Sequence, residues 1–127
     1  MKLPRYVKSL PKFFSRFSYK GYTLIFFKII FLKREIFDNL KSNKPTIQNV
    51  SILKHEEVHL QRAGKLQALK YIFPKIHLQE ELIAYKEQFK FLKQNHETYN
   101  LENVAKHLPC LNYESAKKLI TKTWNEA

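Results

Sequence analysis

The spacing of apolar residues along the second half of the chain predicts helices. After the start signals Pro45 and Thr46, apolar residues recur at helical spacing over residues 47–69. Pro74 ends this helix or the linker after it, and a second helix is predicted over residues 75–94. The apolar positions of the second helix are Leu78, Leu82, Tyr85, Phe89 and Leu92. The pattern therefore predicts two amphipathic helices joined by a short turn.

Two shorter helices are predicted beyond residue 94. Asn100 stands at the N-cap position of the stretch LENVAKHL, and Pro109 stops that helix. Asn112 caps a last helix over residues 113–124, whose apolar face is formed by Ala116, Leu119, Ile120 and Trp124. These helices either complete the hydrophobic core or form a separate C-terminal segment.

The first third of the chain has a composition that favours strands. Residues 22–37 are rich in Ile, Phe, Thr and Tyr, which predicts a hairpin, or one strand and a second piece near residues 29–35. The segment FDNLKSNKP, residues 37–45, is expected to be a loop. Residues 1–21 form a basic, aromatic lead, with a short helix expected around residues 10–17. Strands followed by helices indicate the α+β class, with a small N-terminal sheet.

The length of 127 residues corresponds to one ordinary domain with one core. The single cysteine, Cys110, excludes an intramolecular disulfide, and the default compartment for such a chain is the cytoplasm. The first residues lack the unbroken apolar region of a secretory leader. The most apolar stretch, residues 22–32, is about half the ~20 residues that a membrane helix needs. We therefore expect no signal peptide and no transmembrane segment.

The formal net charge of +12 admits a nucleic acid or an anionic membrane as a partner. The basic residues are mostly lysines, however, and they are spread along the whole chain instead of forming one block. A solvated, lysine-rich surface is therefore the favoured interpretation. A basic nucleic-acid or anionic-surface binding module, built on RYVKSLPKFFSRFSYK, is the alternative.

Residues 55–59 read HEEVH, a motif with a defined chemistry. His55 and His59 are one helical turn apart, so both project from one face and can reach one metal ion. Glu56 is rotated about 100° from His55, which keeps it off the metal but beside a metal-bound water as a general base. The motif lies on the predicted inward face of the helix. The competing interpretation is a pair of buried histidines without a metal.

A third ligand is expected from the second helix. A metzincin-type ligand is excluded, because Arg62 and Lys65 stand where that class has Gly and His. The stretch QEELIAYKEQ offers Glu80, Glu81 and Glu87 instead. Helical projection places Glu81 in the middle of the face that two antiparallel helices would bring onto the histidines, so Glu81 is preferred. His77, one turn before Glu81, remains a competing ligand.

The pair HEEVH and ELIAY resembles the gluzincin zinc metallopeptidases, in particular the soluble minigluzincins and the catalytic domains of the membrane CAAX prenyl proteases. The resemblance covers roughly residues 25–95. It implies one zinc ion held by His55, His59 and Glu81, with Glu56 as general base, under a small sheet packed over the active-site helix. It also implies an endopeptidase whose peptide or protein substrate lies extended along a sheet edge, for which residues 29–35 are the candidate.

One position departs from this resemblance. Tyr85 stands where the membrane members commonly have an aspartate, so the usual carboxylate partner of a ligand histidine is missing there. The departure puts metal affinity or catalytic rate in doubt. An oxyanion-stabilising side chain is also expected, and the unranked candidates are His77, Tyr85, His96 and Tyr99.

The resemblance implies a minimal catalytic domain over residues 1–95 and leaves residues 96–127 as a C-terminal helical segment. This segment either completes the core or keeps the enzyme latent, within a monomer or exchanged between the two chains of a homodimer. Under latency, Cys110 or Glu114 would occupy the metal site, and deletion of residues 96–127 would raise peptidase activity. A non-catalytic zinc scaffold is a further alternative, against which the intact Glu56 argues.

Overall fold

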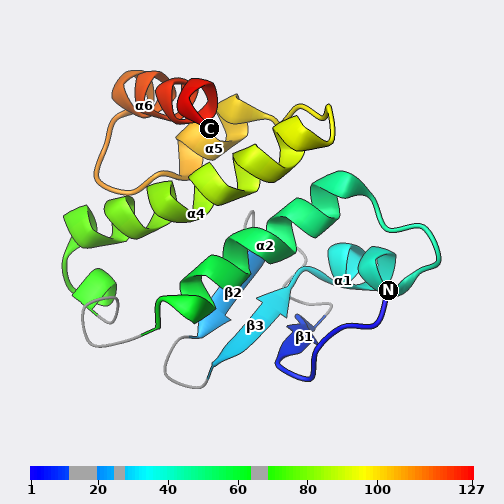
Figure 1. The fold of residues 1–127 in the computed structure, drawn as a ribbon. Helices are drawn as coiled ribbons and strands as arrows, with labels where there is room; N and C mark the ends of the chain where they lie inside the picture. Colours follow the sequence, from blue (N-terminus) through cyan, green and yellow to red (C-terminus); the bar gives the residue numbers. More distant parts are fainter. Residues whose placement is uncertain (12–19, 25–27, 64–68) are drawn as a thin grey trace.

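A computed structural model describes residues 1–11, 20–24, 28–63 and 69–127. It contains a small N-terminal sheet followed by helices, so the α+β class with an N-terminal sheet and two C-terminal helices is confirmed (Figure 1). The strands are β1 (Val7–Ser9), β2 (Gly21–Leu24) and β3 (Ile29–Leu32). The helices are α1 (Arg34–Lys41), α2 (Ile47–Gln61), the 3-10 turn η2 (Leu69–Tyr71), α4 (Pro74–Gln94), α5 (Leu101–His107) and α6 (Tyr113–Glu126).

The sheet has the strand order β1-β3-β2. β2 and β3 pair antiparallel, with Tyr22 opposite Phe31, so the predicted hairpin is confirmed. β1 pairs parallel with β3, with Val7 opposite Ile30. The prediction that residues 29–35 form a sheet edge is therefore wrong, because β3 is hydrogen-bonded on both sides. In the described part of the sheet, β2 is the edge strand that contacts α2.

Helix α1 replaces the strand end and loop expected over residues 33–45. Ile36 and Leu40 are four residues apart and both buried, while Arg34 and Asp38 form an ion pair at 3.8 Å on the exposed face. The prediction failed because Ile and Phe favour strands and Asp and Asn favour loops, whereas burial of one short helical face overrides both preferences. β1 was also missed, since only Val7 of its residues is buried.

The two long helices begin at the expected signals. The side chain of Thr46 caps α2 by accepting a hydrogen bond from the backbone N–H of Asn49, and Pro74 is the first residue of α4. α2 ends at Gln61, before the predicted end at residue 69, and part of that end falls on residues 64–68, outside the described residues. The short helix expected around residues 10–17 also lies largely outside them.

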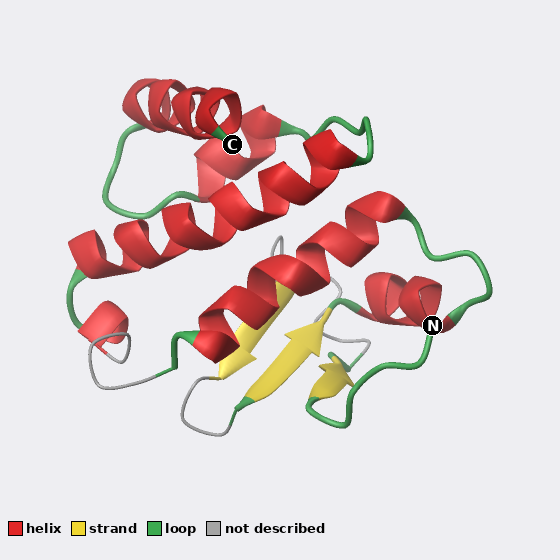
Figure 2. Ribbon diagram, in the orientation of Figure 1, coloured by secondary structure: helices red, strands yellow, loops and turns green. Residues whose placement is uncertain are grey.

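The helices form layers on one face of the sheet. α2 lies between the sheet and α4, and α2 and α4 run antiparallel, as predicted (Figures 1 and 2). α6 packs on α4 on the side opposite α2, and α5 packs against α6. Asn100 and Asn112 cap these last two helices through their side chains, at the positions predicted from the sequence.

Two clusters of buried apolar residues stabilise these layers. The first joins the sheet to α1 and α2 through Val7, Ile30, Leu32, Ile36, Leu40, Ile52 and Leu53. The second joins α4 to the C-terminal helices through Phe89, Leu92, Val104, Ala105, Leu108, Ala116 and Ile120. Residues 96–127 therefore supply part of the core that covers α4, and the polar side chains between α2 and α4 lie between the two clusters.

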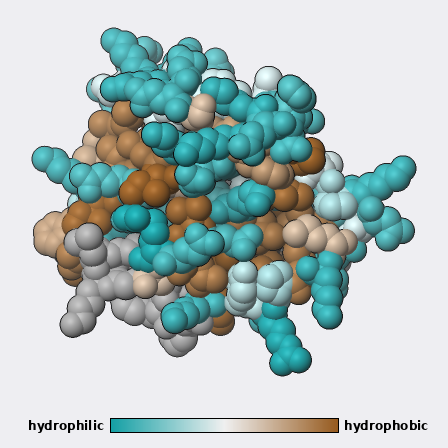
Figure 3. Space-filling view, in the orientation of Figure 1, coloured by the Kyte–Doolittle hydropathy of each residue, from teal (hydrophilic) through white to brown (hydrophobic). Residues whose placement is uncertain are grey.

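The face of the molecule drawn in Figure 3 carries both hydrophilic and hydrophobic residues. Figure 3 shows hydrophilic residues over the region of α6, in keeping with its many exposed lysines. None of the described helices is both long and apolar enough to cross a membrane.

We expect Phe89→Ala to destabilise the protein by about 3–5 kcal/mol, because a fully buried ring is removed from the second cluster. The ring of Trp124, the single tryptophan, lies 5.1 Å from that of Phe89, so tryptophan fluorescence during urea unfolding reports on this region. Phe73→Ala is the matched control, since this ring is 50% exposed and its loss should change the free energy of unfolding by no more than about 0.5 kcal/mol. Equal stability of the two variants would contradict the described packing.

Candidate metal centre

Helices α2 and α4 bring His55, His59 and Glu81 together. Nε2 of His59 lies 2.9 Å from one carboxylate oxygen of Glu81, and Nε2 of His55 lies 3.3 Å from the other. One ligand atom from each residue lies within 4.8 Å of the other two. The i, i+4 spacing on α2 and the antiparallel approach of α4 place the three side chains as the helical projection predicts.

Both histidines are buried and have ring nitrogens without hydrogen-bond partners among the described residues, as expected at a metal site. His55 and His59 are 5% and 2% exposed, and three of their ring nitrogens lack a hydrogen-bond partner among the described residues. Nε2 of His59 is one of them, because its short contact with Glu81 does not have hydrogen-bond geometry. Buried polar atoms are rarely left unpaired without a reason. Two imidazoles and one carboxylate facing a common point fit a divalent cation.

The pKa shifts show that the group favours positive charge at its centre. Burial alone would raise the pKa of Glu81, but the contacts and charges of His55 and His59 hold that pKa well below its usual range. Burial would likewise lower the pKa of His55, yet the hydrogen bond and charge of Glu81 raise it above the ordinary value. A bound cation would likewise place positive charge beside the carboxylate of Glu81.

Glu56 lines the same cleft as this group, and its carboxylate contacts the sheet. Its carboxylate accepts a hydrogen bond from the hydroxyl of Thr23 on β2, and the same hydroxyl lies 3.3 Å from the main-chain oxygen of Glu56. Gly21 makes this close approach possible, since a Cβ atom there would lie 3.0 Å from Cγ of Glu56. Thr23 and Gly21 are site residues that sequence analysis missed, because nothing in the pattern marked β2 as the strand beside the motif.

A cavity of about 560 Å³ opens onto Glu56 and the three candidate ligands. The edge strand β2 forms one wall of this cleft through Gly21, Tyr22 and Thr23. The opposite wall comes from α4 and from the C-terminal segment, which contributes Tyr99, Asn103, Val104 and His107. Asn103 and His107 were not predicted as site residues. Only their spacing of four residues, which places both on one face of α5, could have indicated them.

The other predicted site residues divide into two sets. His77, Tyr85 and Tyr99 line the cleft, whereas His96 is exposed and does not. Nε2 of His77 lies 3.8 Å from Glu81, farther than either nitrogen on α2, and its side chain is 40% exposed. Burial lowers the pKa of His77 below its ordinary value, with Glu81 opposing and Lys70 and His59 adding to the shift. His77 therefore stands at the mouth of the cleft, outside the ligand group.

The ring of Tyr85 packs edge-on against the imidazole of His55, with 4.3 Å between the ring centroids. Cys110 and Glu114, the candidates for latency, are both exposed, and neither lines the cleft among the described residues. The structure thus does not bring either of them to the candidate metal centre.

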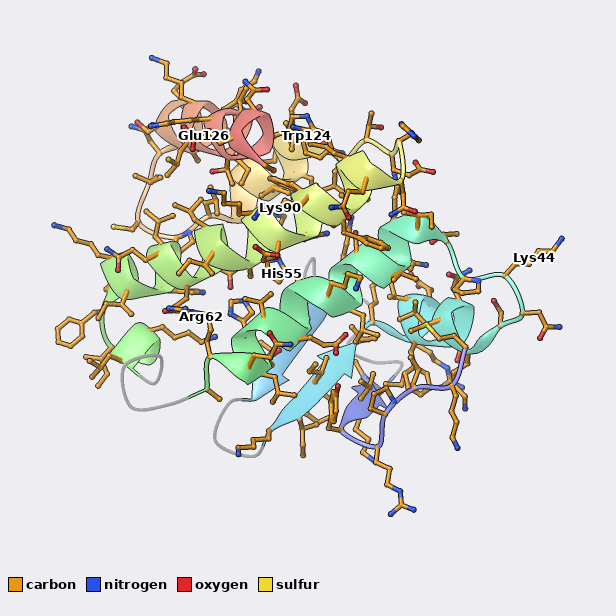
Figure 4. All side chains as sticks on the ribbon, viewed as in Figure 1. Lys44, His55, Arg62, Lys90, Trp124 and Glu126 are labelled. Atoms are coloured by element: carbon orange, nitrogen blue, oxygen red, sulfur yellow. The ribbon has the colours of Figure 1, made fainter. Side chains whose placement is uncertain are left out.

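An ion pair fixes the two helices beside the centre. Both carboxylate oxygens of the buried Glu80 accept hydrogen bonds from the guanidinium of Arg62, at 2.8 and 3.0 Å. Figure 4 labels Arg62 and His55 between α2 and α4. Glu80 raises the pKa of Arg62 above its usual value, so the pair stays charged. Arg62 thereby joins the C-terminal end of α2 to α4 one residue from Glu81.

Comparisons with known proteins add nothing to this description: no protein-family model, no curated protein and no solved structure matches the chain. The candidate centre therefore rests on its own geometry and on the chemistry of its donors.

We expect one zinc ion per chain after incubation with zinc and gel filtration, and almost none for His59→Ala or Glu81→Gln. Each substitution removes one of the three donors that face a common point. Elemental analysis of the purified proteins measures this directly. Glu87→Gln is the matched control, because Glu87 is a carboxylate on the same helix but is exposed and contacts Lys90 instead. Equal zinc in all four proteins, or none in the wild type, would contradict the assignment.

Proposed function

We propose that this protein is a zinc-dependent endopeptidase of the gluzincin type. In this proposal His55, His59 and Glu81 hold one zinc ion, and Glu56 is the general base. The observation that carries the proposal is the arrangement of these groups on one cleft: three converging donors, a separate carboxylate beside them and an edge strand along the wall. Such a combination serves metal-assisted hydrolysis of an extended chain.

The donor set favours zinc among the common divalent ions. Imidazole nitrogens suit zinc, whereas calcium and magnesium prefer oxygen ligands, and two histidines with one glutamate form a known hydrolytic zinc set. When bound, zinc supplies a Lewis acid that polarises the scissile carbonyl and lowers the pKa of a water molecule.

Glu56 moves the proton in this mechanism. Its carboxylate accepts the proton of the attacking water and later donates it to the leaving amine nitrogen. Thr23 holds one oxygen of this carboxylate through its hydroxyl, and the missing side chain at Gly21 leaves room for the carboxylate beside the strand. The sheet thereby fixes the base relative to the helix that carries the ligands.

Strand β2 offers the binding edge for the substrate. It pairs with β3 on one side, and its residues Gly21, Tyr22 and Thr23 line the cleft on the other. An extended peptide added to this edge would form backbone hydrogen bonds whatever its side chains, and its scissile bond would pass Glu56. In this proposal β2, and not residues 29–35, is the sheet edge along which the substrate lies.

Three polar side chains of the cleft remain candidates for stabilising the oxyanion: His77, Tyr85 and Tyr99. The lowered pKa of His77 favours its neutral form near pH 7, in which it can still donate one N–H.

We extend the proposal to latency, through a contact between the two walls of the cleft. Nζ of Lys20, next to β2, donates a hydrogen bond of 3.2 Å to the hydroxyl of Tyr99 and lies 4.6 Å from the centre of its ring. Tyr99 belongs to the C-terminal segment, so this contact joins that segment to the substrate edge. Closing the cleft at this point would restrict access for a folded protein substrate.

We expect Glu56→Gln to lower peptidase activity by about 10²–10⁴-fold while zinc content stays at one per chain, because only the proton acceptor is removed. Cleavage of a fluorogenic protein substrate and elemental analysis measure the two quantities. Glu57→Gln is the matched control, since Glu57 is adjacent but bonds to Tyr6, away from the cleft. A zinc-loaded wild type that cleaves nothing, even when Lys20 and Tyr99 are substituted, would favour a non-catalytic zinc site.

We expect Lys20→Met and Tyr99→Phe each to raise activity toward a protein substrate about tenfold, since each breaks the hydrogen bond that closes the cleft. Measurement of kcat/KM on a short and a long substrate separates access from chemistry. Lys117→Met, which removes a lysine from the exposed side of α6, controls for the change in charge. Lower activity of Tyr99→Phe with unchanged Lys20→Met would instead identify Tyr99 as the oxyanion stabiliser.

A further inference from the structure

The first ligand histidine has an unpaired nitrogen. Nδ1 of His55 is buried and has no hydrogen-bond partner among the described residues, while its Nε2 faces Glu81. A histidine that binds a metal through one nitrogen normally donates the N–H of the other to an acceptor, which fixes the tautomer and the ring plane. Tyr85 packs edge-on against this ring, and it has no carboxylate that could accept this hydrogen bond.

Gln88 lies at the right place to supply the acceptor. It is 1% exposed and stands seven residues after Glu81, two turns along the same face of α4. Its side-chain amide donates a hydrogen bond of 3.1 Å to the hydroxyl of Ser51. Ser51 in turn stands four residues before His55 on α2, so Gln88 reaches α2 one turn from the ligand ring.

The bonds around Ser51 determine which way the amide of Gln88 faces. The hydroxyl of Ser51 has one hydrogen, which it donates to the main-chain oxygen of Gln48 at 2.6 Å. It therefore presents only an acceptor to Gln88, and the NH₂ end of the amide must face Ser51. The carbonyl oxygen is left as the end available to a donor. The side chain of Gln88 also has a contact of hydrogen-bonding type with the side chain of His55.

We propose that Gln88 is a positioning residue for the metal site, whose side-chain oxygen accepts a hydrogen bond from Nδ1–H of His55. The bond holds the tautomer in which the lone pair of Nε2 points to the metal. Ser51 orients the amide for this task. This inference rests on the proposed metal site and adds the residues that prepare one of its ligands.

A neutral acceptor suits this position. Glu56 and Glu81 already place two carboxylates around the cleft, and a third buried carboxylate would add the cost of desolvating another charge. An amide oxygen accepts the hydrogen bond without that cost, and it does not compete with Nε2 for a proton. The amide also bonds α2 to α4, so the same side chain positions the ring and the helix pair.

Zinc affinity, measured by competition with a chelator, tests the proposal. We expect Gln88→Met, which has similar length but no acceptor, to weaken zinc binding about 10–100-fold. Gln88→Glu keeps an acceptor while losing the bond to Ser51, so its affinity should stay within about threefold of the wild type. Ser51→Ala, which removes a single hydroxyl and frees the amide to turn, should give an intermediate loss and remains informative if Gln88→Met fails to fold.

Two further observations separate positioning from general stability. Thr123→Val is the matched control, because it removes a buried hydroxyl that bonds to Leu119 on α6, away from the site, and its zinc affinity should equal that of the wild type. Nitrogen-15 NMR of the zinc-loaded protein should show the Nδ1–H tautomer of His55 in the wild type and its loss or broadening in Gln88→Met. Equal zinc affinity of Gln88→Met and the wild type would overturn this inference alone, whereas a wild type that binds no zinc would overturn the proposed function with it.

Discussion

Three donor atoms can meet at one cation only while α2 and α4 keep their spacing and register, because His55 and His59 come from one helix and Glu81 from the other. Two polar links between the helices maintain that register. The ion pair of Arg62 with Glu80 stands at one end of the site, and the hydrogen bond of Gln88 with Ser51 stands at the other. Apolar packing alone tolerates small sliding of helices, whereas two hydrogen-bonded links fix the distances along their axes.

The position of the site between two hydrophobic clusters explains its electrostatics. The clusters on either side keep the histidines and Glu81 largely buried at the inner end of the cleft, so charges there interact strongly. Glu81 can stay ionised only beside positive charge, which lowers its pKa, and the histidines are the partners at hand. The carboxylate of Glu56 is held at the sheet by the hydroxyl of Thr23, and its charge contributes to the raised pKa of His55. Glu56 and the three candidate ligands thus line one cleft but are held by different partners.

The sequence was sufficient for the helical half of the site and insufficient for the sheet. The spacing of His55 and His59, the face of Glu81 and the caps Asn100 and Asn112 depend on local helix geometry, which a pattern of residues expresses directly. β1 and α1 depend on pairing and burial between distant segments, so their residues carry weak local signals. Because β1 was missed, β3 was taken for the edge. Thr23 and Gly21 could not be found without knowing that β2 lies there instead. Gln88 follows Glu81 by two turns on the same face of α4, yet only the hydrogen bond to Ser51 shows that its carbonyl oxygen is the end that can accept another hydrogen bond.

The C-terminal segment contributes both to the core and to the lining of the cleft, so completing the core and covering the cleft do not exclude each other. On α5, Val104 and Ala105 are buried in the second cluster, while Asn103 and His107 line the cleft, with Nδ1 of His107 2.7 Å from the main-chain oxygen of Asn103. A deletion of residues 96–127 would therefore expose Phe89 and Leu92 together with the cleft, and any change in activity would mix unfolding with access. The ring of Tyr99 packs against this cluster beside Phe89, and its hydroxyl contacts Lys20, so the hydrogen bond can open while the ring stays packed. Latency in this fold would then be a property of one polar contact at the mouth of the cleft, and the helices behind it would remain part of the core.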